Sequence, residues 1–456
     1  MFNINPILNA DSYKLSHFLF YPEGTTNVYS YMESRGGRYD ETLFFGLQGF
    51  LKEYLSKPVT RLDIRYAKGF AQEHGLPFNE EGWLHILNKY DGYLPVEIKA
   101  VPEGMLVPTH NVLMTVENTD PLVPFITSYI ETMALRLWYP ITVATRGYNM
   151  KRNIKPYYDA TSDVGDMSFS VLDFSARGCS SFESNAIGGA AHLVNFAGSD
   201  SMGAIDYVKQ LYGGKILGYS VPATEHSIMC AYGHNNELAS FERMVDIAQP
   251  GSILSVVSDT WNIFEAVEKW VTLKDKIQSK NLTLVIRPDS GDIHEVLDRI
   301  LPVIASGFGT TKNNKGYHVI NGAKVLWGDG MNEETITLPF YEAMMHDISA
   351  DSVMAGSGGG LLQADIDRDT CKFAFKASNI TINGVDKPIA KDPITDHGKQ
   401  SKKGRMELHN INGYLRTVTD GMARNFENKD ILETVYRNGS FIRETTMDEI
   451  RSRVKL

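Results

Sequence analysis

The sequence has little cysteine, no long uninterrupted hydrophobic run and no excess of positive charge. Its three cysteines, Cys179, Cys230 and Cys371, form neither a disulfide framework nor a metal-spaced cluster. This scarcity argues against a disulfide-stapled secreted domain and indicates a reducing compartment. Zinc-ligand spacings, a Walker loop, a dinucleotide fingerprint and a nucleophile elbow are also missing, so the sequence predicts no dedicated metal site.

Membrane-directing segments are missing too. Residues 1–20 lack the charged start and apolar core of a signal peptide. The most apolar long region, residues 122–145, is interrupted by Glu131 and Arg136 and therefore predicts a buried segment. We expect a cytoplasmic protein with no membrane partner. The formal net charge of -10 argues against a general nucleic-acid binder.

Residues 282–292 contain the most informative stretch. Residues 282–286 are apolar or β-branched and predict a strand buried on both faces. Arg287, Pro288, Asp289, Ser290 and Gly291 then end it. In α/β enzymes, catalytic and binding residues typically lie at the C-terminal ends of buried parallel strands. Taken alone, the stretch is explained equally well without a functional role, by an Arg–Asp pair that only closes a strand end.

The same pattern of strand, polar tip and helix repeats from about residue 168 to residue 375. Strands are expected at 168–172, 216–219, 255–257, 282–286, 324–327 and 352–355, with a further tip at 198–200. About seven such units predict an irregular β/α barrel, with all tips around one pocket. The predicted fold class is α/β, with the barrel at 136–375 and a second α+β domain at 1–135 plus 376–456.

Outside the repeat, strands are expected at 26–32 and 96–101 and helices at 50–55 and 80–89. Turns are expected at Asn412-Gly413 and Asn438-Gly439, and a final helix from Met447. Asn332 is placed to cap a helix.

Several tip residues suit a phosphorylated sugar. The loop 356–360 is rich in glycine, which lets backbone N–H groups approach an anion. Arg177, Arg287 and Arg368 can pair bidentately with phosphate oxygens. A flexible turn and surface arginines are the alternatives. The basic loop 399–405 either screens a diphosphate or is a solvated charge run.

Acidic residues at the strand tips and one histidine complete the candidate site. Asp289 and Asp329 suit ribose hydroxyls, which donate to carboxylates. Asp259 could do likewise or hold an arginine, although structural capping is its simplest explanation. His226 could shuttle a proton, bind phosphate or attack a phosphoryl group.

The whole chain also resembles the nicotinamide phosphoribosyltransferases. The resemblance rests on long, specific motifs at residues 9–17, 29–33, 45–48, 95–104, 116–120, 138–145, 218–226, 286–291, 328–330, 356–363 and 401–405. It implies transfer of the phosphoribosyl group of phosphoribosyl pyrophosphate to nicotinamide. It also implies a head-to-tail homodimer with active sites at the subunit interface, Mg²⁺ carried by the diphosphate, and ATP as an optional coupled substrate.

The resemblance assigns roles residue by residue. It implies nicotinamide contacts from Phe174, Asp200 and, across the interface, Tyr13 and Asp11. It implies that His226, Arg287 and Asp289 are catalytic, and that His226 is phosphorylated when ATP hydrolysis is coupled. It also implies contacts to the sugar, the phosphate and the diphosphate, and the analysis of the strand tips adds Asp259 to them. Together these residues are Arg177, His226, Arg287, Asp289, Gly328, Asp329, Gly358, Gly359, Arg368, Lys376, Lys391, Lys399, Arg35 and Asp259.

Two departures and three alternatives accompany this resemblance. The loop from Arg35 to Tyr39 is short, and Ala374 stands where the family has a serine near the phosphate. A nicotinate phosphoribosyltransferase is the nearest alternative, against which Asp200 argues because a carboxylate repels nicotinate. A binding protein that lost turnover and a barrel lyase are the others, and the lyase leaves the glycine loop and the cations unexplained.

Overall fold

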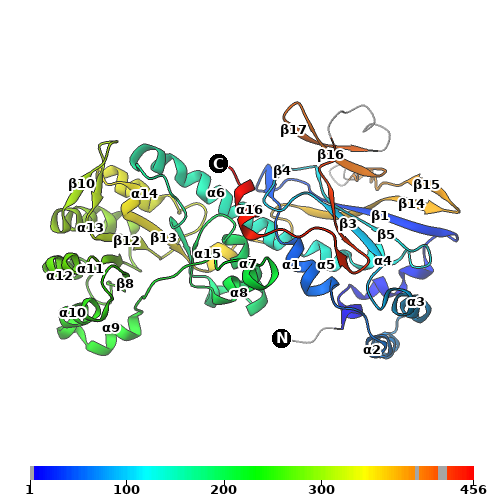
Figure 1. Ribbon diagram of the computed structural model, residues 1–456, viewed down its shortest axis with the longest axis horizontal. Helices are drawn as coiled ribbons and strands as arrows, with labels where there is room; N and C mark the ends of the chain where they lie inside the picture. Colours follow the sequence, from blue (N-terminus) through cyan, green and yellow to red (C-terminus); the bar gives the residue numbers. More distant parts are fainter. Residues whose placement is uncertain (1–4, 396–399, 420–428) are drawn as a thin grey trace. The chain divides into compact units, whose positions relative to one another are not determined.

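The computed structural model describes residues 5–395, 400–419 and 429–456. The chain forms two compact units (Figure 1). The first unit comprises residues 1–145, 209–214 and 366–455, and the second comprises 146–208, 215–365 and 456. The helix α6 (Trp138–Thr161) begins in the first unit and ends in the second. The domain bounds expected at residues 135 and 375 stay a prediction, since compactness alone does not define a domain.

The first unit is built on a seven-stranded sheet of order β15-β14-β1-β5-β3-β18-β19, antiparallel at each pairing. Strands from both ends of the chain therefore share one sheet. The strands of this unit are β1 (Thr25–Ser34), β2 (Glu41–Leu43), β3 (Val96–Ala100), β4 (Leu106–Pro108), β5 (Val112–Asn118), β14 (Phe373–Ile382), β15 (Val385–Pro388), β16 (Met406–Ile411), β17 (Tyr414–Thr419), β18 (Glu433–Arg437) and β19 (Ser440–Phe441).

Local sequence explains most of these elements. The two predicted turns join β16 to β17 and β18 to β19, with positive φ at Asn412, Gly413, Asn438 and Gly439, as tight hairpin turns require. The helices are α1 (Leu47–Phe50), α2 (Arg61–Glu73), α3 (Glu80–Tyr90), α4 (Ile126–Tyr129), α5 (Glu131–Leu135) and α16 (Met447–Arg453). The helix predicted at 50–55 is a π-helical turn at Leu51–Leu55 that continues α1.

The second unit alternates strands and helices, as predicted. Its strands are β6 (Val171–Asp173), β7 (Gly198–Ser199), β8 (Ile253–Val257), β9 (Thr283–Arg287), β10 (Thr310–Lys312), β11 (His318–Ile320), β12 (Ala323–Trp327) and β13 (Val353–Ser357). Its helices are α7 (Phe182–His192), α8 (Met202–Leu211, whose end belongs to the first unit), α9 (His226–Tyr232), α10 (Glu237–Ile247), α11 (Ile263–Thr272), α12 (Lys274–Ser279), α13 (Ile293–Phe308), α14 (Leu338–Met345) and α15 (Gly359–Leu362).

Six of these strands form a parallel sheet of order β7-β6-β13-β12-β9-β8, which confirms the predicted parallel α/β architecture. The strand predicted at 216–219 is wrong. Only isolated parallel bridges join Tyr219 to Gly198 and Ala223 to Ser255. Pro222, between them, has no N–H to donate, and this limits a regular ladder. The regular sheet therefore has one strand fewer than the seven expected.

Capping and packing fix the helices behind the sheet. Asp292 accepts from the Glu295 N–H at the start of α13, and Asn262 caps α11. Phe241 and Trp270 stack with ring centroids 4.1 Å apart. The helix cap predicted at Asn332 is wrong: its side chain accepts from Glu334 and Thr335 in a turn, and α14 starts only at Leu338. Within the described residues, no helix is long and apolar enough to span a bilayer.

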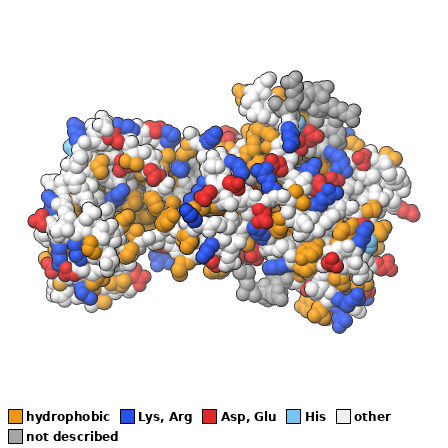
Figure 2. All heavy atoms as spheres, in the orientation of Figure 1, with side chains coloured by type: hydrophobic (Ala, Val, Ile, Leu, Met, Phe, Trp, Pro, Cys, Tyr) orange, Lys and Arg blue, Asp and Glu red, His pale blue; other side chains and the backbone are white. Residues whose placement is uncertain are grey.

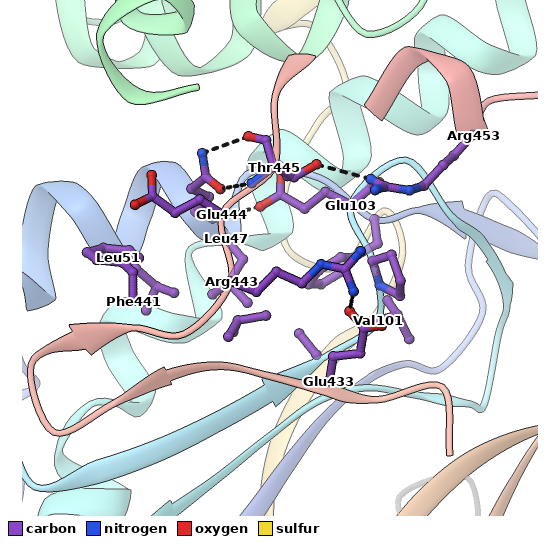
Figure 3. A pocket seen from close by; sticks show the side chains of 15 residues that line it. Leu47, Leu51, Val101, Glu103, Glu433, Phe441, Arg443, Glu444, Thr445 and Arg453 are labelled. Atoms are coloured by element: carbon purple, nitrogen blue, oxygen red, sulfur yellow. Dashed lines mark hydrogen bonds and ion pairs between the residues drawn. The ribbon is translucent and has the colours of Figure 1, made fainter. Parts of the chain in front are cut away.

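The first unit contains a small cavity beside a buried acid, Glu103 (Figure 3). The Glu103 carboxylate accepts from the N–H groups of Gly46 and Gln48, at 3.0 and 2.7 Å, and from the Tyr212 hydroxyl at 3.0 Å. Burial raises the pKa of Glu103, although these donors oppose the shift. At the edge of the same cavity, Arg443 pairs with Glu433, and both are partly exposed.

Replacing Glu103 with alanine is therefore expected to destabilise the first unit by about 3 kcal/mol or more, since three buried donors lose their acceptor. The measurement is the urea midpoint followed by far-UV circular dichroism. Glu433→Ala is the matched control, and its exposed ion pair predicts a loss below about 1 kcal/mol. Equal losses in both variants would contradict a structural role for Glu103.

Candidate functional site

The predicted tip residues of the second unit lie at one edge of its parallel sheet. Phe174 follows β6, Asp259 follows β8, Arg287 ends β9, and Gly328 and Asp329 follow β12. Parallel strands end at the same edge, so these side chains converge. Figure 2 shows hydrophobic side chains gathered on the visible face of this unit, at the level of β12 and β13, with charged side chains over the surrounding helices.

A cavity of about 350 Å³ is lined by residues of this sheet and of the segment 219–223. Its lining includes three predicted residues, Phe174, Asp200 and Arg287. Most of the remaining wall is apolar or aromatic. The other lining residues are Phe169, Leu172, Ser199, Tyr219, Ser220, Val221, Ala223, Ile253, Ser255, Val285, Lys324, Leu326 and Met354. An apolar pocket with a few polar groups is the usual form of a small-molecule site.

The Phe174 ring forms one wall of the cavity. The backbone N–H of Phe174 donates to the Ser357 carbonyl at 2.9 Å, which connects the tip of β6 to the end of β13. The Arg287 guanidinium carbon lies 5.8 Å from the ring centroid. A Cβ at Gly356 would lie 2.3 Å from the ring, so only glycine leaves room for Phe174 here. The ring position is therefore set by backbone from two strands.

Asp200 presents the cavity with an exposed carboxylate. Its N–H donates to the Asp173 carbonyl at 3.0 Å, and its side chain accepts from the Ser220 hydroxyl at 2.5 Å. Asp173 is itself fully buried, and its carboxylate accepts from Ser175 and Ser199. The sequence did not single out Ser220, although it lies within the motif at residues 218–226. One oxygen of Asp200 is thus fixed by a hydroxyl.

Asp259 connects three segments of the site. One carboxylate oxygen lies 3.0 Å from His226 Nε2, and the other accepts from the Asp289 N–H at 3.1 Å and the Ser290 hydroxyl at 2.5 Å. Its side chain is almost fully buried, whereas that of His226 is half exposed. Asp259 therefore anchors His226 and the loop after β9.

Asp289 lies among charged neighbours. Burial raises its pKa, and the charges of Asp259 and Asp329 act in the same direction, whereas Arg287 and His226 oppose the shift. A Cβ at Gly328 would lie 2.5 Å from Asp289 Oδ1, so the carboxylate packs directly against backbone. The Trp327 indole N–H donates to the Asp329 carbonyl at 2.7 Å and fixes the neighbouring loop.

The glycine loop and two arginines complete this edge. Gly358 and Gly359 stand at the start of α15, and a Cβ at Gly178 would lie 3.0 Å from the Cα atom of Gly359. Arg177, next to Gly178, is exposed. Arg287 Nε is buried and has no hydrogen-bond partner within the described part of the chain. Buried donors of this kind suit an anionic ligand.

The remaining predicted residues belong to the first unit. Tyr13 is 55% exposed, and Asp11 accepts from the Thr132 hydroxyl at 2.5 Å. Arg35 Nε lies 2.8 Å from Glu33 Oε1, while Arg368 lies 3.1 Å from Asp369. Lys399 falls outside the described residues. These positions do not by themselves test the predicted roles.

Cations gather around Lys376 in the first unit. Burial lowers the Lys376 pKa, and the positive charges of Arg35, Lys14 and Lys391 lower it further, while Glu131 opposes them. Lys14 also pairs with Glu131. The sequence did not single out Lys14, although it lies within the motif at residues 9–17. Three positive charges and one carboxylate therefore act on the Lys376 ammonium.

Two family models match the chain. The model described as the nicotinate phosphoribosyltransferase (NAPRTase) family matches residues 169–439, and that of the nicotinamide phosphoribosyltransferase N-terminal domain matches residues 5–98. The first match contains the sheet edge described above.

Whole-chain comparisons agree. A protein of Xanthomonas campestris named nicotinamide phosphoribosyltransferase is 45% identical, covering 98% of this chain and 97% of its own length. One of Acinetobacter baylyi with the same name is 33% identical, covering 99% and 97%. The fold is similar to the crystal structure of a nicotinate-nucleotide pyrophosphorylase from Pyrococcus furiosus, with a TM-score of 0.64 at 15% identity over 99% of this chain and 96% of that chain. This chain belongs to the nicotinate phosphoribosyltransferase family.

Proposed function

We propose that the chain is a nicotinamide phosphoribosyltransferase of NAD salvage. It would join nicotinamide to phosphoribosyl pyrophosphate and release nicotinamide mononucleotide and pyrophosphate. The relatives of this name cover nearly the whole chain. The observation that carries the choice of acceptor is Asp200, whose carboxylate lies at an aromatic pocket and is oriented by Ser220. A carboxylate accepts from a carboxamide N–H and repels the carboxylate of nicotinate.

The geometry supports a dissociative displacement. The C1–O bond to pyrophosphate would break through an oxocarbenium-like state, and the nicotinamide nitrogen would form the new bond to C1. Phe174 holds the nicotinamide ring so that its nitrogen is in line with C1, which is a positioning effect. Arg177, Arg287 and His226 stabilise the departing diphosphate, and the Asp289 carboxylate stabilises the positive sugar. Gly358 and Gly359 receive the sugar phosphate.

We propose that Mg²⁺ binds at this site through the substrate. Among the described residues, the group of three metal-ligating side chains that could hold an ion lies on α13 and α14 and not at the sheet edge. The diphosphate oxygens would therefore provide most ligands, and Mg²⁺ would neutralise part of their charge. ATP is proposed as an optional coupled substrate, with His226 as the phosphorylated residue.

We further propose a homodimer in which the partner subunit supplies the cations around Lys376 and the exposed Tyr13. Arg35, Lys391, Lys399 and Arg368 would complete the phosphate and diphosphate contacts. We also propose that the segment bridged at Tyr219 and Ala223 occupies the seventh position of an irregular barrel. A nicotinate phosphoribosyltransferase is the second candidate, since the matching family model carries that description.

Offering nicotinamide and nicotinate side by side, with phosphoribosyl pyrophosphate and Mg²⁺, tests the proposal. Nicotinamide mononucleotide as the dominant product supports it. Nicotinate mononucleotide as the dominant product would replace the acceptor, and no product from either would point to a binding protein.

The variant Asp200→Ser should shift acceptor preference toward nicotinate. Losing the carboxylate removes a charged acceptor for the amide, so kcat/KM for nicotinamide should fall at least about tenfold relative to nicotinate. The measurement is the ratio of the two kcat/KM values. Asp275→Ser, on an exposed part of α12, is the control and should leave the ratio unchanged. An unchanged ratio in Asp200→Ser would remove the carboxamide role.

His226→Ala should abolish the stimulation of synthesis by ATP, while the rate without ATP falls by less than about tenfold. Synthesis is measured with and without ATP in both proteins. His234→Ala, in the same unit and packed on Trp261, is the matched control. Equal losses with and without ATP would make His226 a plain diphosphate ligand.

The pH dependence of kcat/KM should show an acid limb caused by Asp289. Because burial raises its pKa, the active carboxylate is lost as pH falls through a value above the ordinary 3.8 of an aspartate. Carbon-detected NMR of the free protein should show a carboxyl that titrates in this raised range and that the Asp289→Asn variant lacks. A titration at or below 3.8 would contradict the raised pKa.

A further inference from the structure

Four side chains outside the sheet edge form a cluster on α13 and α14. His294 and Asp298 stand four residues apart on α13, and Glu342 and His346 stand four residues apart at the end of α14. Residues with this spacing lie on one face of a helix. His294 Nδ1 lies 2.5 Å from Glu342 Oε1, and His346 Nε2 lies 3.1 Å from Asp298 Oδ1. The pairs match in order, so the two helices run in the same direction.

The spacing of the ligand atoms suits one metal ion. One atom each of Asp298, Glu342 and His346 lies within 4.8 Å of the others, and His294 contacts Glu342. In a tetrahedral zinc site with bonds of about 2.0–2.2 Å, ligand atoms are about 3.3–3.6 Å apart. The His294–Glu342 and His346–Asp298 contacts, at 2.5 and 3.1 Å, are shorter than this value, and His294 is not one of the three residues whose atoms lie within 4.8 Å of one another. The half-exposed side chain of His294 would move to become the fourth ligand.

The charge of the cluster is not balanced by the protein. Glu342 is 7% exposed, and its ion-pair partner among the described residues is His294, which is cationic only when protonated. Within the described residues, neither Glu342 nor Asp298 pairs with a lysine or an arginine. A buried carboxylate needs a compensating cation. Two imidazoles and two carboxylates are the ligand types that zinc and similar divalent ions bind, whereas Mg²⁺ prefers octahedral oxygen sites.

We propose that His294, Asp298, Glu342 and His346 bind a divalent transition metal ion of the zinc type, which cross-links α13 to α14. The ligands come from two helices whose paired residues are 48 positions apart, so no linear zinc spacing marks them. The site is structural in type, because the protein supplies four ligands. The helix α13 begins directly after the Asp289 loop, and α14 precedes β13 and the glycine loop, so the ion would hold the two supports of the sheet edge together.

The test is titration of the untagged, metal-stripped full chain with Co²⁺, in the presence of excess Mg²⁺. Co²⁺ is the probe because its visible absorption reports a tetrahedral environment. We expect one equivalent with tetrahedral absorption, displaced by Zn²⁺, and a metal-dependent rise of the unfolding temperature. His294→Ala and His346→Ala should each weaken Co²⁺ binding at least tenfold, while nicotinamide mononucleotide synthesis with Mg²⁺ is retained.

Two controls separate the cluster from other sites. His74→Ala, an exposed histidine at the end of α2, should leave the Co²⁺ titration unchanged. Glu342→Gln preserves the shape of the buried side chain and should still lower affinity. A double variant His294→Ala/His346→Ala that binds Co²⁺ as the native chain does would overturn the proposal. So would a native chain without a stoichiometric tetrahedral signal, because the four residues would then form two interhelical hydrogen bonds only.

Discussion

Parallel pairing of the strands in the second unit is the constraint on which the site depends. Because β6, β13, β12, β9 and β8 all run in one direction, the residues that follow them meet at one edge. A single antiparallel strand would place its tip at the opposite edge. The hydrogen bonds of Asp259 then turn this proximity into a fixed arrangement, since one side chain holds both His226 and the loop after β9. Sheet direction brings the residues together, and one buried carboxylate orients them.

Local patterns were sufficient where a residue has one strong preference. The run at 282–286 indicated a buried strand, and β9 covers residues 283–286 of it and ends at Arg287. The Asn-Gly pairs at 412 and 438 indicated tight hairpin turns, because only those residues adopt positive φ readily, and both turns are present. The parallel sheet followed from the alternation of strands and helices. The assignment of roles to Phe174 or Asp200, in contrast, rested on resemblance to a family.

Other features depend on partners that are distant in sequence. The contact between Ser220 and Asp200 exists only because two strand tips lie side by side, and the sequence of residues 218–226 does not predict it. The strand expected at 216–219 is replaced by isolated bridges at Tyr219 and Ala223, which depend on the partners Gly198 and Ser255 elsewhere in the chain. Asn332 caps a turn and not a helix, since α14 begins only at Leu338. The His–carboxylate pairs of α13 and α14 arise in the same way, from helix packing.

The contact between Gly356 and Phe174 restricts how the acceptor pocket can change over evolution. Any side chain at position 356 meets the aromatic ring before it meets a substrate. A single substitution at position 356 would therefore displace the Phe174 ring and not only change the shape of the pocket. New acceptors would be reached through other lining positions, such as Ser220 or Val221, where side chains already line the cavity. The part of the lining formed by Phe174 is therefore its least adaptable part, and diversity among such proteins should accumulate elsewhere in the lining.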